Sequence, residues 1–230
     1  MFLRSPFRRL PESLAVLAGL LLLMAWDAST ADALLARWMG GPSGFALRNH
    51  WLLEGVLHQG ARALAWGLVV WLAVGLRWPL GVLRALAPAR RAWLLAATLG
   101  GMLLVSALKQ GSLSSCPWDL QEFGGMARHV SHWAWLQADG GPGHCFPAGH
   151  ASAGFAWVAG WFAFRDWRPG VARGWLVAAL VAGAAIGLAQ QLRGAHFASH
   201  TLWTAWICWT WAWAFSAALP PQEDDAPAAG

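Results

Sequence analysis

Six apolar runs alternate with polar stretches along the whole chain. Within each run the apolar residues follow one another with few charged interruptions, which is typical of a helix that is apolar on all sides. Helices of this kind that approach 20 residues can cross a bilayer. The sequence therefore predicts an all-α, six-helix transmembrane bundle. The six runs lie at about 13–26, 60–76, 92–108, 150–164, 174–192 and 201–219.

These runs also set the predicted domain. We expect residues 1–219 to form a single transmembrane domain and the acidic, Pro-containing residues 220–230 to form a disordered tail. The first run follows several Arg residues and precedes Ala31-Asp32-Ala33, which resembles a signal-peptide cleavage site. Because the run is retained in the chain, we expect it to be a first transmembrane helix.

The composition supports a membrane protein and argues against a soluble domain. Hydrophobic residues make up 57% of the 230 residues and charged residues only 12%, which is too apolar for a soluble chain of this size. The 19 Trp residues suit anchoring at the membrane surface. The net charge of +5 does not indicate nucleic-acid binding, because the basic residues cluster beside the apolar runs.

The basic residues predict how the bundle is oriented. Six spans would place both termini on the same side of the membrane. Ten of the Lys and Arg residues fall on that side, largely in short loops, and six fall on the other. By the positive-inside rule the termini are then cytoplasmic. The loop at 110–149 and the turn at 193–200 would face the periplasm, across the inner membrane of a bacterium.

All eight His residues lie in the predicted external segments or at the helix ends that face them. This distribution indicates one external site that uses imidazole chemistry. Residues 27–59 are expected to form an external excursion with short amphipathic helices. Four polar residues of this excursion are expected on a solvated face: Arg48, His50, Glu54 and His58.

The stretch at 143–154 is rich in small residues and precedes a predicted helix. Pro147 lies just before the helix start, and His150 lies in its first turn. Free N–H groups and the positive end of the helix dipole suit a phosphate at such a position. The imidazole can exchange a proton near neutral pH. Tight helix packing explains the small residues equally well.

Two further polar clusters lie at the same predicted level. One begins at Lys109 and reaches Cys116-Pro117, and the other extends from Gln190 to His200. Together the three clusters offer two permanent cations, at least two imidazoles and a helix N-terminus. This set suits phosphoryl transfer, in which catalysis depends mainly on charge stabilisation, a nucleophile and an acid.

In these clusters the chain resembles the type 2 phosphatidic acid phosphatase (PAP2) superfamily of membrane phosphatases, as a divergent bacterial branch. The family pattern is Lys-x6-Arg-Pro, then Pro-Ser-Gly-His, then Ser-Arg-x5-His-x3-Asp. Here Lys109 precedes Cys116-Pro117 by the same spacing, 147–150 reads Pro-Ala-Gly-His, and 194–200 matches the end of the third motif. The resemblance covers about residues 60–215.

Four positions depart from the family pattern. Cys116 replaces the Arg of the first motif, and Ala148 replaces the Ser of the second. In the third motif, Gln190 replaces the Arg and His200 replaces the Asp. An Arg follows three residues after Gln190, which is close to one helical turn. We therefore expect Arg193 to replace the lost cation.

The resemblance implies roles for the matched residues. His196 would attack the phosphorus and form a phosphohistidine, and an alignment with His200 as the nucleophile ranks second. Otherwise His200 would orient His196 in place of the family's carboxylate, for which Asp119 or Glu122 is another candidate. His150 would protonate the leaving oxygen. The phosphate-binding positions would be Lys109, Arg193, Ala148 and Gly149.

Two cysteines each flank one of the motifs. If the motifs converge on one site, Cys116 and Cys145 come close together, and because the periplasm is oxidising we predict a disulfide between them. The family requires no metal or other cofactor. The pair His129-x2-His132 lacks further ligands at a familiar zinc spacing.

The predicted activity is that of a metal-independent membrane phosphatase or phosphotransferase acting at the periplasmic face. Its candidate substrates are an isoprenoid diphosphate, a phosphatidyl phosphate and a lipid A phosphate. Two alternatives remain open. The chain is either a non-catalytic relative that binds a lipid headgroup, which the four departures favour, or a membrane protein with a His-ligated metal or haem.

Overall fold

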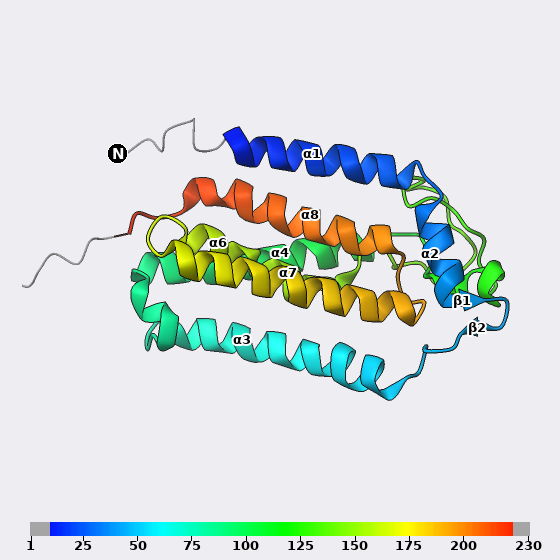
Figure 1. The fold of residues 1–230 in the computed structure, drawn as a ribbon, viewed down its shortest axis with the longest axis horizontal. Coiled ribbons are helices and arrows are strands. Elements are labelled where there is room, and N and C mark those ends of the chain that lie inside the picture. The colour runs from blue at the N-terminus through cyan, green and yellow to red at the C-terminus, as the bar shows by residue number, and fades with distance from the viewer. Residues whose placement is uncertain (1–9, 223–230) are drawn as a thin grey trace, which may run out of the picture.

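The computed structural model describes residues 10–222, and these form a bundle of roughly parallel helices (Figure 1). The helices along the bundle are α1 (Leu10–Asp27), α3 (Ala61–Gly75), α4 (Pro88–Gln110), α5 (Ser152–Phe155), α6 (Ala159–Phe164), α7 (Pro169–Leu192) and α8 (Ala198–Phe215). The short helix α2 (Ala31–Met39) lies at one end, beside an antiparallel hairpin of β1 (Gly40–Gly41) and β2 (Gly44–Phe45). The described chain is otherwise helices and loops, with one isolated bridge between Leu120 and Ala127. The all-α prediction is confirmed.

All six apolar runs become helical, with differences at their boundaries. The helices α4 and α7 begin before the predicted runs, at Pro88 and Pro169, because proline fits the first turn of a helix. The second helix also begins early, since a π-helical segment at Leu52–Gly60 leads directly into α3. The fourth run is irregular: 3-10 turns at Gly149–Ala151 and Ala156–Val158 flank α5.

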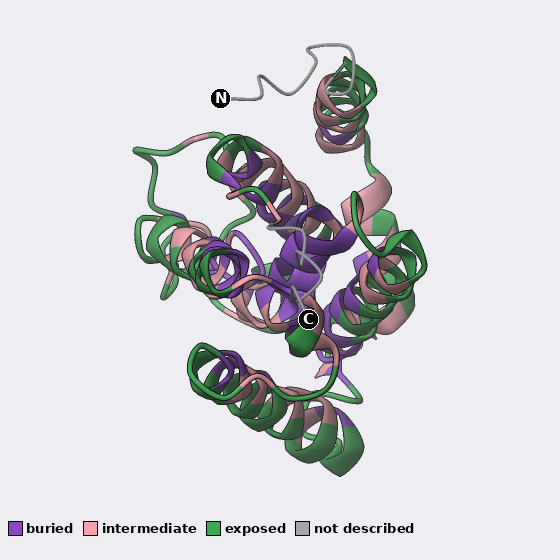
Figure 2. Cartoon of the chain, turned by 90° about the vertical axis from the view of Figure 1, so that its left-hand side faces the viewer, coloured by how far each residue is buried: buried purple, intermediate pink, exposed green. Residues whose placement is uncertain are grey.

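The bundle has an apolar exterior as well as an apolar core. Three helices, α1, α4 and α7, are long and apolar enough to cross a membrane. Figure 2 shows buried residues gathered between the helices and exposed residues on the outer faces. Leu94 and Phe162 are fully buried, whereas Leu22 and Val177 are exposed. Exposed apolar side chains on the outside of a helical bundle suit contact with lipid.

Glycines set the close approach between α5 and α7. A Cβ added to Gly154 would lie 2.2 Å from the backbone nitrogen of Gly183, so the two backbones are in direct contact. In the next helix, α6, a Cβ added to Gly160 would lie 2.3 Å from Nε1 of Trp175, which belongs to α7. Small residues at such crossings let membrane helices pack closely. The contact fixes the helix start that carries His150 against α7.

The connecting segments divide between the two ends of the bundle (Figure 1). The start of α1 and the end of α8 lie at one end, whereas α2, the hairpin and residues 111–148 cover the other. A small apolar cluster that includes Phe45, Phe123 and Phe197 holds this cover together. The covered end is where the polar motifs meet.

Residues 220–222, which the sequence assigns to a disordered tail, belong to the described chain and make contacts there. Pro220 accepts a hydrogen bond from Nε of Arg90 at 2.9 Å, and the Gln222 side chain accepts one from the N–H of Ala87 at 3.3 Å. These contacts continue the ordered chain beyond the predicted boundary at residue 219. The remainder of the predicted disordered tail, from residue 223, lies outside the described residues.

Candidate active site

A cavity of about 310 Å³ lies at the covered end of the bundle, among α3, α4, the helix start at 149–152 and α7. Lys109, Gly149 and His150 line it, so residues of the first two predicted motifs share one space. The cavity joins charged and imidazole groups to an apolar wall, which suits an anionic head with an apolar tail. Other lining residues include His58, Arg62, Trp66, Met102 and Ile186.

Lys109 stands in the last turn of α4 and makes two local contacts. Its Nζ donates a hydrogen bond to the carbonyl of His144. Its aliphatic chain passes over Gly149, where an added Cβ would lie 3.1 Å from Cδ of the lysine. The glycine of the second motif therefore makes room for the lysine of the first. The ammonium can exchange the carbonyl for a phosphate oxygen, which is a stronger, charge-assisted partner.

A second imidazole touches His150. The Nε2 atoms of His58 and His150 are in direct contact, and the ring centroids lie 3.9 Å apart. Burial and the charge of Arg193 lower the pKa of His58, so this ring is neutral near neutral pH and can exchange a proton with its partner. The expectation that His58 lies on a solvated face is wrong, because the helical segment 52–60 carries it to the cavity wall.

Arg193 is buried at the end of α7 and is engaged by protein groups. Its Nε donates to the carbonyl of Arg48 at 2.8 Å, and its Nη1 donates to Oε1 of Gln190 at 3.2 Å. Its Nη2 lies 3.6 Å from a carboxylate oxygen of Glu54. Arg193 does not line the cavity that holds Lys109. Arg48 is exposed, as expected, and only its backbone carbonyl contacts this guanidinium. The side chain of Glu54, also expected on a solvated face, is 41% exposed and lies beside the guanidinium.

The two histidines of the third motif contact each other. Their Nδ1 atoms lie 3.4 Å apart. His196 is 4% exposed and lines a separate space of about 10 Å³, roughly the volume that one water molecule needs. Burial lowers the pKa of His196, and the neighbouring His200 and Lys109 lower it further. The ring is therefore neutral, which is the form that can act as a nucleophile.

A disulfide lies beside His196. The Sγ atoms of Cys116 and Cys145 are 2.13 Å apart and the Cα atoms 5.1 Å apart, which is the predicted pairing. Sγ of Cys145 lies 3.5 Å from Nδ1 of His196. In the described part of the chain, these three residues are the one group of potential metal ligands whose donor atoms cluster. The sulfurs of a disulfide are not the thiolates that bind metals.

Ala148 does not line the cavity. Its N–H donates to the carbonyl of His200 at 3.1 Å, and its carbonyl accepts a hydrogen bond from Oγ1 of Thr204 at 3.1 Å. Both backbone groups are thus engaged by residues of α8, whereas the sequence predicted a phosphate-binding position at Ala148. These bonds instead connect the second motif to the start of α8.

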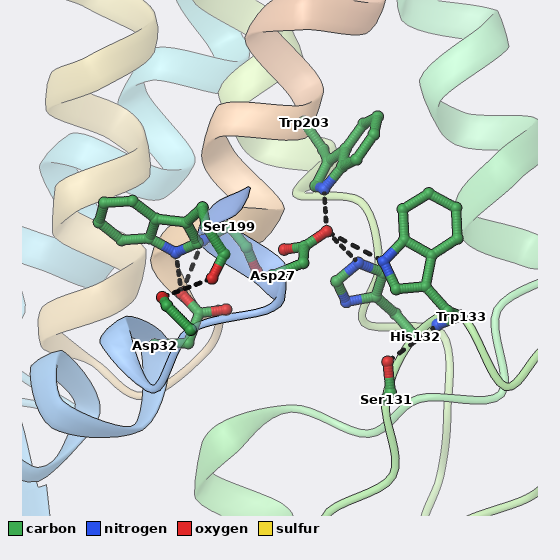
Figure 3. Close-up of polar contacts among 9 residues, drawn as sticks. Asp27, Asp32, Ser131, His132, Trp133, Ser199 and Trp203 are labelled. Carbon is green, nitrogen blue, oxygen red and sulfur yellow. Dashed lines mark hydrogen bonds and ion pairs between the residues drawn. The ribbon is translucent and has the colours of Figure 1, made fainter. Parts of the chain in front are cut away.

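Asp27, at the C-terminal end of α1, belongs to none of the three motifs but lines a cavity together with His200. Its Oδ2 accepts a hydrogen bond from Nε2 of His132 at 3.1 Å (Figure 3). The same oxygen accepts bonds from Nε1 of Trp133 at 3.0 Å and of Trp203 at 2.8 Å. The side chains of Asp27 and His132 are 6% and 10% exposed. Both line a second cavity, of about 130 Å³, that His200 also lines.

The two carboxylates that the sequence offered as replacements lie elsewhere. Asp119 accepts a hydrogen bond from Nε1 of Trp118 at 3.0 Å, and burial raises its pKa. Glu122 pairs with Arg37 through side chains that are 42% and 56% exposed. Among the described contacts, neither carboxylate touches His196 or His200.

Helices of membrane-crossing length and a cavity lined by a lysine and two imidazoles define the class of protein: a helical membrane-type bundle with a candidate site for phosphate chemistry. The model of the PAP2 superfamily matches residues 91–223, more than half of the chain. The chain therefore belongs to the PAP2 superfamily, whose members are generally phosphatases. No curated protein and no solved structure matches the chain. The matched region contains all three motifs and excludes Asp27 and His58.

Proposed function

We propose that this protein is a membrane phosphatase that acts on a lipid phosphate or diphosphate at the periplasmic face of a bacterial inner membrane. The observation that carries the proposal is the cavity shared by Lys109 and His150 within the fold of a phosphatase superfamily. A cation and an imidazole suit the phosphate and its leaving oxygen. The apolar wall formed by Trp66 and Met102 suits the adjoining part of a lipid tail.

In the proposed reaction, Nε2 of His196 forms a bond to phosphorus while the bond from phosphorus to the lipid oxygen breaks. Lys109 and the N–H of Gly149 hold the phosphate oxygens. His150 gives a proton to the leaving oxygen. Water then attacks the phosphohistidine, releases phosphate and returns a proton to His150. As the family resemblance implies, the scheme uses no metal.

Substrate binding must bring the phosphate to His196, which lines a separate and narrower space. We propose that the anion displaces the His144 carbonyl from Nζ of Lys109 and opens the path to His196. Contacts that catalysis requires often form only in the complex with substrate.

We also propose that all six helices cross the membrane and that both termini of the chain lie in the cytoplasm. The start of α1 and the end of α8 share one end of the bundle, with the Arg-rich loops. Ala138 and Arg168 are exposed at opposite ends, and Cys208 is buried. In intact cells a membrane-impermeant thiol reagent should label Ala138→Cys but not Arg168→Cys. Labelling of Arg168→Cys but not of Ala138→Cys would show that the bundle has the opposite orientation in the membrane.

The test of the activity is phosphate release from a lipid panel by detergent-purified protein. His196→Ala and His150→Ala should each reduce release by about 100-fold or more. A matched control is His50→Ala, because that ring is exposed and stacks on Trp51. Unchanged release in both site variants would refute the assignment.

A second candidate function is non-catalytic binding of a lipid headgroup. It is favoured by the separation of His196 from the cavity of Lys109 and by the protein contacts that engage Arg193. This candidate predicts that lipid phosphates bind and that Lys109→Met weakens their binding, without phosphate release by the wild-type protein.

A further inference from the structure

The third motif lacks its carboxylate because His200 stands in that position. We propose that Asp27 supplies the missing negative charge to His196, through His132 and His200. The inference rests on the proposed phosphatase function. It assigns Asp27 and His132 as positioning residues, since neither touches the phosphate.

The first link joins Asp27 to His132. The carboxylate accepts the Nε2 proton of the imidazole at 3.1 Å, and the indoles of Trp133 and Trp203 bind the same oxygen. Figure 3 shows these donors converging on Asp27. No described group donates a hydrogen bond to Oδ1, which is buried. Burial lowers the pKa of His132 overall, while the charge and hydrogen bond of Asp27 act to raise it.

The second link joins His132 to His200. The two rings meet edge to face with centroids 5.9 Å apart. Phe146 holds both rings in place: it stacks on His132 at 4.1 Å with 8° between the planes, and it meets His200 edge-on at 5.3 Å. Both imidazoles line the cavity of about 130 Å³, which has the volume and the polar groups to hold a bridging water.

The third link is the 3.4 Å contact between the Nδ1 atoms of His200 and His196. When Nε2 of His196 bonds to phosphorus, its ring becomes cationic as long as Nδ1 keeps its proton. That proton can pass to Nδ1 of His200. The Nε2 proton of His200 then passes to a water in the cavity that both rings line, and this water gives a proton to Nδ1 of His132. The number of protons is unchanged, and the positive charge now lies on His132, paired with Asp27.

Other carboxylates at this cavity are already committed. Asp32 accepts bonds from Nε1 of Trp26 and from the N–H of Ser199. Asp139 accepts bonds from Ser115 and from the N–H of Gly141. Among the described carboxylates that line this cavity, only Asp27 contacts an imidazole. Its position in α1, before the matched region, explains why the motifs do not reveal it.

The decisive variant is Asp27→Asn, because its amide oxygen still accepts the three hydrogen bonds and only the charge is lost. We expect kcat for lipid phosphate hydrolysis to fall roughly 10- to 100-fold, with KM and the melting temperature close to those of the wild type. Asp32→Asn is the matched control and should leave kcat within about twofold, since its oxygen keeps both partners. An unchanged kcat in Asp27→Asn would overturn the inference.

A second background isolates the connection between Asp27 and the third motif. His200→Asp restores the family's carboxylate next to His196. In that background Asp27→Asn should change kcat by less than about twofold. The effects of Asp27→Asn and His200→Asp on kcat would then be strongly non-additive. Equal losses in both backgrounds would show that Asp27 acts only on the structure, and would overturn the inference.

Folding defects are controlled with another variant. If Asp27→Asn unfolds, His132→Gln decides, because its amide keeps a donor for Asp27 but cannot carry a proton onward; an unchanged kcat overturns the inference. Absence of phosphate release by the wild-type protein would refute the proposed function and this inference together. Release by the wild type, with no effect of Asp27→Asn, would refute this inference alone.

Discussion

His58 and His150 touch through their Nε2 atoms, although 92 residues separate them in the chain. One ring comes from the second motif, and the other comes from the helical turn that leads into α3. Both Nδ1 atoms are buried, and no described group hydrogen-bonds to them. The residue proposed as the general acid therefore has an imidazole as its direct neighbour, and this partner lies outside the region matched by the superfamily.

The first prediction concerns this pair. His58→Ala should lower kcat by roughly 10-fold or more, because general acid–base groups contribute about 10²–10⁴-fold and His58 is in direct contact with the proposed acid. The measurement is steady-state phosphate release across a range of lipid concentrations. His50→Ala serves as the control, and equal kcat values for the two variants would remove His58 from the mechanism.

A second prediction concerns Gly149, whose missing Cβ leaves room for Lys109. Gly149→Ala would place a carbon 3.1 Å from Cδ of the lysine, so the ammonium should shift by a few tenths of an ångström. We expect KM to rise several-fold with a smaller change in kcat. Gly170→Ala is the control, because a Cβ there meets nothing within 4 Å. Identical KM values for the two variants would contradict the proposed role of Lys109.

The disulfide allows a third prediction. Cys116 and Cys145 are 29 residues apart, and closing a loop of this length is worth about 3–4 kcal/mol in the chain-entropy description. Cys116→Ser should therefore lower the melting temperature clearly. Alkylation followed by intact-mass measurement should show two additional modified thiols only after reduction. Alkylation of both cysteines without reductant would show that the disulfide is absent.

A fourth prediction concerns pH. The pKa values of His58, His132 and His196 all lie below the ordinary value of 6.5, with burial as the largest cause. Below about pH 6.5 the unfolded chain binds protons that these neutral, folded histidines do not, so stability should fall as the pH decreases. Thermal unfolding in detergent between about pH 7 and about pH 5 should show this loss. In His196→Gln the melting temperature should fall less steeply with decreasing pH. A melting temperature that is independent of pH would contradict the burial of these groups.

The sequence predicted the helices well because a single apolar run of this length can satisfy its backbone hydrogen bonds within a membrane only as a helix. It also placed Lys109 and His150 at the same end of the bundle, because each stands at the end of such a run, and in the structure both line one cavity. The boundaries were less predictable. The π-helical segment 52–60 and the 3-10 turn at 149–151 depend on packing against α7, which periodicity along one segment does not reveal.

The sequence did not reveal Asp27 or His58, because their partners are distant along the chain. Asp27 and His132 are 105 residues apart, and neither belongs to a motif with a fixed spacing. The contacts Asp27–His132 and His58–His150 arise because the N-terminal segments of the chain lie at the covered end of the bundle. A polar residue that ends an apolar run, as Asp27 does, was the available signal.

In the proposed reaction His196 carries the phosphoryl group during hydrolysis. The most direct measurement is trapping of the intermediate: the protein is mixed with a lipid phosphate labelled in its phosphate, quenched at high pH and mapped by peptide mass spectrometry. We predict an acid-labile phosphoryl group on His196 in the wild type and none in His196→Ala. Two results would refute His196 as the nucleophile. One is phosphate release with the label on another residue, and the other is full activity in His196→Ala.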